Sequence, residues 1–185
     1  MNLVNRVKNI LLSPKTEWPV IAGETASLSS LLTTYVIPVA AIPAMAALLG
    51  GFVSGGSMRY TISTAIITYV SAILGYVITA YVVDLLANTF KSEKDLNRSA
   101  QLVAYSSTAS WVAGILIIIP GLGTIGAIAG AIYAIYLMYL GVGPIKKTPE
   151  DQKVVYMVII FVVLLAVSMV LGSVLGMLFL TSAAM

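Results

Sequence analysis

The feature that most constrains this chain is a stretch without any Asp, Glu, Lys or Arg that runs from Ser99 to Ile145. One helix needs about 20 apolar residues to cross a bilayer, so the stretch is about twice the length of one span. We therefore predict a hairpin of two membrane-spanning helices, closed by the turn Pro120-Gly121-Leu122-Gly123.

The composition of the whole chain supports a lipid environment. Hydrophobic residues make up 59% of the sequence, charged residues only 9%, and the mean hydropathy is +1.02. Backbone polar groups in lipid must bond to one another, so spans are helices or closed barrels, and the long uncharged runs favour helices. We predict an all-α polytopic membrane protein in which residues 25–185 form one transmembrane domain. Its five spans are expected at about 28–53, 62–90, 102–119, 124–141 and 154–180.

Residues 1–24 are expected to form a short amphipathic segment that lies in the membrane interface, because apolar residues recur there at helical spacing. The apolar face holds Leu3, Val4, Val7, Ile10 and Leu11, and the opposite face holds Asn5, Arg6, Lys8 and Asn9. Pro14 should end the first helix, and Trp18 should anchor the segment at headgroup depth.

The distribution of basic residues predicts the orientation. Five spans place the two termini on opposite sides, and nine of the ten Lys and Arg residues then share the side of the amino terminus, while the other side holds only Arg59. Positive residues stay cytoplasmic, so we expect a multi-pass protein of the cell (cytoplasmic or inner) membrane with its amino terminus inside and its carboxyl terminus outside. Basic residues beside spans contact lipid headgroups, so we expect no nucleic-acid partner.

The sequence lacks the residue types that most enzymes use for catalysis. The chain contains no Cys and no His, which removes thiolates, the usual zinc, haem and copper ligands, and the commonest base near neutral pH. We expect no cofactor and no catalytic role.

Prolines and small residues suggest how the spans pack. Pro38 and Pro43 lie inside the first span and should kink or unwind it, which serves packing or, in some proteins, forms a transport site. Small residues at spacing four let helices approach closely, and we expect at least one such seam to face a second copy of the chain or another membrane protein. The seams are Ser71/Gly75/Thr79, Gly126/Gly130/Ala134 and Gly172/Gly176.

Asp84 is the only acid inside a predicted span, and Asn88 and Lys91 follow it on the same helical face. Acids in spans are paired or functional. Two interpretations remain open: an ion pair with Lys91 or Arg98, or a role in an ion path or partner contact. The third span adds the polar residues Tyr105, Ser106 and Thr108 near its start.

These polar residues define the alternatives to a structural protein. A small transporter or channel would join Asp84, the broken first span and the hydroxyls of the third span in one polar path. A lipid enzyme would require Asp84 to meet Ser106, Thr108 or a tyrosine. Otherwise the chain is expected to organise membrane lipids or partner proteins.

Several motifs resemble those of a known family. They are NLVNRVKNILLSPKTEWPVIAGE before the first span, AYSSTASWVAGI, IPGLG with Pro120, Gly121 and Gly123, and YAIYLMYLGVGP with Tyr136, Tyr139 and Gly141. Together they resemble the prokaryotic branch of the Yip1 domain family, including the DUF1282 group. The resemblance implies a polytopic helical membrane domain with a cytoplasmic amino terminus. Eukaryotic members are associated with Golgi and endoplasmic reticulum traffic, Rab-type GTPases and membrane shaping.

Overall fold

The computed structural model describes residues 2–180, and every regular element within that range is a helix. The all-α expectation is therefore confirmed. The elements in chain order are α1 (Leu3–Leu12), α2 (Pro14–Gly23), α3 (Leu28–Leu31), η1 (Leu32–Val36), α4 (Ile37–Val53), α5 (Met58–Leu86), η2 (Ala87–Phe90), α6 (Leu96–Ala113), η3 (Gly114–Ile118), α7 (Leu122–Lys146) and α8 (Glu150–Leu180).

Five helical segments of the described chain are long and apolar enough to cross a membrane, as predicted. The protein is therefore a multi-pass membrane protein. The third span begins earlier than expected because Asp95 caps α6: its carboxylate accepts hydrogen bonds from the N–H groups of Asn97 and Arg98 at 2.8 and 3.2 Å. The segments are Leu28–Val53, Met58–Phe90, Leu96–Ile118, Leu122–Lys146 and Glu150–Leu178.

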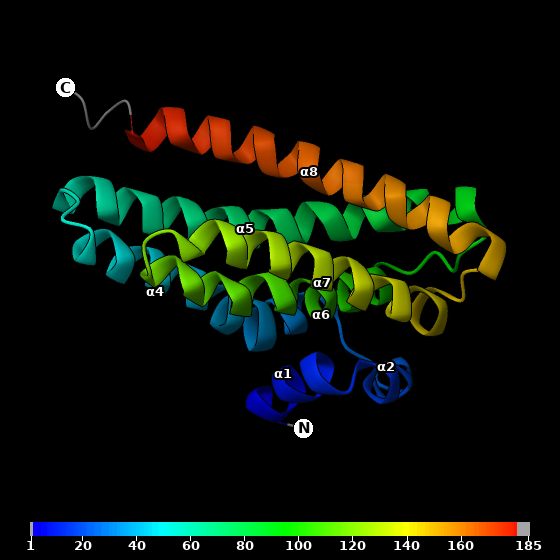
Figure 1. The fold of residues 1–185 in the computed structure, drawn as a ribbon. Helices are drawn as coiled ribbons and strands as arrows, with labels where there is room; N and C mark the ends of the chain where they lie inside the picture. The colour runs from blue at the N-terminus through cyan, green and yellow to red at the C-terminus, as the bar shows by residue number, and fades with distance from the viewer. Residues whose placement is uncertain (1, 181–185) are drawn as a thin grey trace.

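The spans lie side by side in a bundle, with α8 along α5 on one face and with α1 and α2 on the opposite face (Figure 1). The loops at 91–95 and 147–149 meet at one end, which we name the basic end because of its lysines. The turns at 54–57 and 119–121 meet at the other end. Helices α1 and α2 pack against α6 and α7, so the amino-terminal segment is part of the folded bundle.

The hairpin of α6 and α7 forms the tightest part of the bundle. Gly121 begins α7 with a φ of 86°, which an L side chain rarely adopts. A Cβ added at Gly126 would lie 2.8 Å from the carbonyl oxygen of Ala113, and one added at Gly130 would lie 2.8 Å from the Cβ of Ala113. The predicted turn and the predicted glycine seam on α7 are both confirmed.

The other two seams differ from the prediction. A Cβ added at Gly75, Gly172 or Gly176 would meet no atom of the described chain within 4 Å. The prediction that helices of one molecule approach each other closely at these glycines is therefore wrong. Gly75 instead borders an open space between helices.

The prolines of the first span have different effects. The chain departs from regular α geometry at the π-helical turn η1, which ends two residues before Pro38, as expected for a residue that lacks an N–H and crowds the preceding turn. Pro43 lies within α4, and a Cβ added at Gly114 would be 2.6 Å from the Cβ of Pro43. Pro43 thus has a packing role against the end of α6.

Candidate functional site

The amino-terminal helix α1 turns a different face to the protein than its apolar pattern predicts. Arg6 and Ile10 are buried, at 5% and 0% exposure, whereas Val4 and Leu12 are 71% and 72% exposed. The expected division into an apolar lipid-facing side and a polar side is therefore wrong for Arg6. The reason is that the bundle supplies partners for a buried guanidinium.

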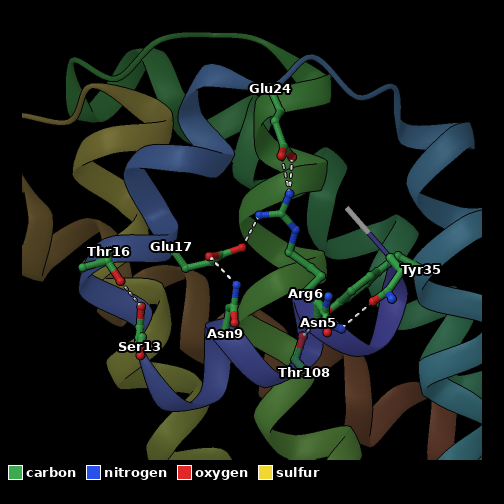
Figure 2. A network of polar contacts seen from close by, with 10 residues as sticks. Asn5, Arg6, Asn9, Ser13, Thr16, Glu17, Glu24, Tyr35 and Thr108 are labelled. Carbon is green, nitrogen blue, oxygen red and sulfur yellow. Dashed lines mark hydrogen bonds and ion pairs between the residues drawn. The ribbon is translucent and has the colours of Figure 1, made fainter.

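Those partners are two carboxylates on and after α2. One Nη of Arg6 donates to Glu17 and the other donates to Glu24, while Asn9 Nδ2 donates to Glu17 at 3.2 Å (Figure 2). Burial by itself would lower the pKa of Arg6, but the hydrogen bond to Glu24 and the negative charges of Glu24 and Glu17 outweigh it and raise this pKa. The guanidinium therefore remains charged. We name Arg6, Glu17 and Glu24 the charge clamp.

Aromatic rings of two spans pack next to the charge clamp. The guanidinium carbon of Arg6 lies 5.4 Å from the ring centre of Tyr105, within cation–π distance. Tyr105 makes an edge-to-face contact with Tyr35 at 4.7 Å. The Tyr35 hydroxyl lies 2.7 Å from Thr108 Oγ1 (Figure 2). A polar cavity of about 590 Å³ is bordered by Arg6, Glu24, Tyr35 and Tyr105.

Side chains of α6 donate hydrogen bonds to the backbone at the end of α2 and just after it. Arg98 Nη1 donates to the carbonyl oxygens of Ala22 and Glu24 at 2.8 and 3.2 Å, and Gln101 Nε2 donates to that of Glu24 at 3.1 Å. Arg98 is therefore occupied by α2 and is not a partner of Asp84. Backbone carbonyls that end a helix are in this way satisfied by side chains of a span.

Helix α7 holds α1 and α2 from the other side. The hydroxyl of Tyr133 donates to the carbonyl oxygen of Leu11 at 2.6 Å. Trp18 is only 1% exposed and fits against Gly141, where an added Cβ would lie 2.6 Å from the indole. The expectation of Trp18 as a headgroup anchor is wrong, because Gly141 leaves room for its ring inside the protein. Tyr136 and Tyr139 are exposed, and Tyr136 stacks on Tyr133 at 5.6 Å.

Asp84 has a different ionic partner from those predicted. Lys146 Nζ lies 3.6 Å from Asp84 Oδ1 and donates to Ser99 Oγ at 2.6 Å and to the carbonyl oxygen of Asp95 at 3.2 Å. Ser99 Oγ also lies 3.3 Å from Asp84 Oδ1. Asn88 and Lys91 are exposed on and just after η2, and Lys91 has a left-handed φ of 52° that ends this helix. The break at η2 and Lys91 ends the regular helix that would have kept these residues on one face.

Ser99 and Lys146 form a hydroxyl–amine pair of the kind that some hydrolases use as nucleophile and base. Both side chains, however, are 0% exposed. A substrate would have to displace the loops of the basic end to reach them. The arrangement therefore supports a structural polar core that ties α5, α6 and α7 together.

Two variants separate the structural from the functional interpretation of Asp84. Lys146→Met leaves the Asp84 carboxylate without its ion pair, so we expect a loss of about 3 kcal/mol in the free energy of unfolding. Asp84→Asn leaves the buried Lys146 without its counter-charge, although the lysine keeps its bonds to Ser99 and Asp95, so we expect a loss of about 2 to 3 kcal/mol. Unfolding of the purified protein in mixed detergent micelles measures both. An unchanged free energy of unfolding in both variants would contradict the structural role.

The polar residues predicted in the third span separate onto two sides of α6. Tyr105 and Thr108 face the charge clamp, whereas Ser106 borders a second cavity of about 300 Å³ between α5, α6, α7 and α8. Asp84 lies with Ser99 and Lys146 and borders neither cavity. Successive helical residues are about 100° apart, so a cluster in sequence does not remain a cluster in space.

Sequence reasoning missed the charge clamp and Lys146. A signal for the clamp was present, since Glu17 and Glu24 are seven residues apart in a short segment that follows a basic helix. Lys146 carried a weaker signal: it immediately follows the apolar run that ends at Ile145.

A comparison with known protein families identifies the family of this chain. The model of the Yip1 domain matches residues 8–182, which include the charge clamp residues Glu17 and Glu24 and all five spans up to the end of α8. Neither the curated proteins nor the solved structures include a match to this chain. Because the family model covers nearly the whole sequence, the chain belongs to the Yip1 domain family.

Proposed function

We propose that this protein is a non-enzymatic organiser of the membrane, in which α1 and α2 act as a wedge at the cytoplasmic surface. The observation that carries the proposal is the charge clamp, which fixes the buried side of α1 against the bundle. The opposite side of α1 then has a fixed direction relative to the spans.

The outward side of α1 has the chemistry of an interfacial helix. Val4, Lys8 and Leu12 are exposed and follow one another at spacing four, so they share a face. Valine and leucine side chains favour the acyl boundary by about 1.5 to 3 kcal/mol each when fully buried. The lysine stem lies along apolar surface while its ammonium group contacts anionic headgroups. Together these residues support insertion into one leaflet only.

The proposed location of the wedge follows from charge. Nine of the ten Lys and Arg residues lie in the amino-terminal segment or in and beside the basic end. We therefore place the basic end and the amino terminus on the cytoplasmic side of the cell membrane. The carboxyl-terminal residues 181–185 lie outside the described residues. Membrane lipids are the partners that we propose.

A transport path receives less support. The cavity that Ser106 borders does not include Asp84, and Pro38 borders a separate groove with Ile115 and Ile118. The groups that a path would have to join therefore lie in three surroundings. An organising role requires no such continuity.

Vesicle shape tests the wedge. In proteoliposomes of phosphatidylcholine and phosphatidylglycerol, we expect the protein to shift the diameters seen by electron cryomicroscopy toward smaller vesicles. Val4→Ser combined with Leu12→Ser should remove the shift, because the inserted apolar surface is lost.

The matched control changes two exposed apolar residues of the spans, Leu85→Ser with Val154→Ser, which are 68% and 59% exposed. These variants should keep the shift. Equal vesicle diameters with and without the protein, or an unchanged shift in the α1 double variant, would overturn the proposal. Protein-dependent solute flux without a change in diameter would favour the transport alternative.

A further inference from the structure

We propose that the cavity of about 300 Å³ between α5, α6, α7 and α8 is a binding site for the head group of a lipid-soluble quinone. The inference concerns binding only. It is independent of the wedge, because the cavity lies on the side of α6 away from the charge clamp.

The cavity contains hydroxyl groups that need a partner. Ser106 is 1% exposed, and its Oγ has no hydrogen-bond partner among residues 2–180. Ser71 Oγ, on the facing helix α5, is also buried without a partner in the same described range. Both serines border this one cavity. Buried hydroxyls are nearly always bonded, so two unbonded ones at one cavity indicate that a ligand with accepting oxygens belongs there.

The depth of the serines narrows the ligand class. Ser71 lies near the middle of α5, and Ser106 is ten residues from the start of α6 and twelve from the end of η3. At 1.5 Å per residue, each is about 15 Å or more from either end of its helix. The ester oxygens of a phospholipid lie outside the hydrocarbon core, and its acyl chain carries no acceptor at this depth. A quinone brings two ring carbonyl oxygens into the apolar part of the membrane.

The walls of the cavity also fit a flat ring. Tyr76, Trp111 and Phe161 border it, and most other lining residues are aliphatic or methionine. Aromatic walls favour flat, apolar rings by stacking and edge contacts. The volume is at the lower limit for a small-molecule site, which accommodates a ring and leaves the isoprenoid tail in lipid.

Tryptophan fluorescence provides a direct measurement. The chain has two tryptophans, so in a Trp18→Phe background the emission reports Trp111 at the cavity wall. Decyl-benzoquinone is titrated into nanodiscs that contain this protein. We expect saturable quenching, and decylbenzene, which has the same chain but no carbonyl, should not displace the quinone.

Three variants in this background test the geometry. Ser106→Ala should weaken binding about five- to tenfold, because a ring carbonyl of the quinone loses its hydrogen bond from this serine. Gly75→Leu should abolish saturable quenching, since its side chain grows into the cavity without meeting an atom within 4 Å at Cβ. Gly172→Leu is the matched control, equally uncrowded and away from the cavity, and it should bind as the parent does.

Four outcomes would overturn the inference. They are quenching that rises linearly without saturation, displacement by decylbenzene, unchanged affinity in Ser106→Ala, and equal binding by the Gly75→Leu and Gly172→Leu variants. None of these outcomes depends on vesicle shape, so the wedge and the quinone site succeed or fail separately.

Discussion

Replacement of Arg6 by methionine is expected to release α1 and α2 from the bundle and to lower the free energy of unfolding by about 3 kcal/mol. Methionine fills the volume but leaves the carboxylates of Glu17 and Glu24 without their cation. The Glu17 side chain is only 7% exposed, so its charge would be buried without compensation. The loss is at the lower limit for a broken buried pair because the Glu24 side chain is 40% exposed.

Two measurements detect the release of α1 and α2 from the bundle. Trypsin cleavage after Lys8 and Lys15 should accelerate, since detached helices open more readily than docked ones. The emission of Trp18 should shift to the red as its ring leaves the contact with Gly141. Lys8→Met is the matched control for cleavage after Lys15 and for the Trp18 emission, because Lys8 is exposed and lies on the opposite side of the same helix.

A rescue separates charge from packing. If uncompensated carboxylates cause the loss, then Arg6→Met combined with Glu17→Gln and Glu24→Gln should recover most of the stability. The charge clamp would be disproved as the attachment of α1 if Arg6→Met left both the cleavage rate and the Trp18 emission unchanged.

Gly130→Leu is expected to separate α6 from α7 and to lower the stability of the bundle by about 3 kcal/mol. Its Cβ would lie 3.0 Å from the Cα of Ser110 and 3.2 Å from the carbonyl oxygen of Ala109, in addition to the clash with Ala113. Backbone atoms cannot rotate away as a side chain would, so the helices themselves must move. Unfolding in mixed detergent micelles measures the loss.

The control for this prediction is Gly172→Leu, whose Cβ has open space within the described chain. Leucine is the better helix former by several tenths of a kcal/mol, so this variant should unfold at the same or a higher denaturant concentration. Similar losses for the two leucine variants would show that the α6–α7 seam is not the closest contact of the bundle.

The sequence predicts the spans well and the polar contacts poorly, for physical reasons. Length and hydropathy determine whether a helix crosses a bilayer, and both are properties of a local window. The turn at Gly121 and the seam of Gly126 and Gly130 are local as well, since they depend on neighbouring helices of one hairpin. These features could therefore be predicted from residue spacing.

The ionic partners could not be predicted in this way, because they depend on how distant helices meet. Asp84 is close in sequence to Lys91 and Arg98, but it pairs with Lys146, 62 residues further along the chain. Arg6 could not be placed correctly either, since its burial depends on Glu17, Glu24 and Tyr105 together. Periodicity gives the faces of a helix, and only the tertiary structure decides which face is covered.

The docking of α1 and α2 has a consequence for the order of assembly. These helices leave the ribosome before the five spans, but the groups that hold them are made later: Arg98 is 76 residues after Ala22, and Tyr133 is 122 residues after Leu11. Closing such long loops is slow compared with forming a helix. During synthesis the amino-terminal pair must therefore wait at the membrane surface, with its guanidinium and carboxylates in contact with water, until the α6–α7 hairpin has inserted.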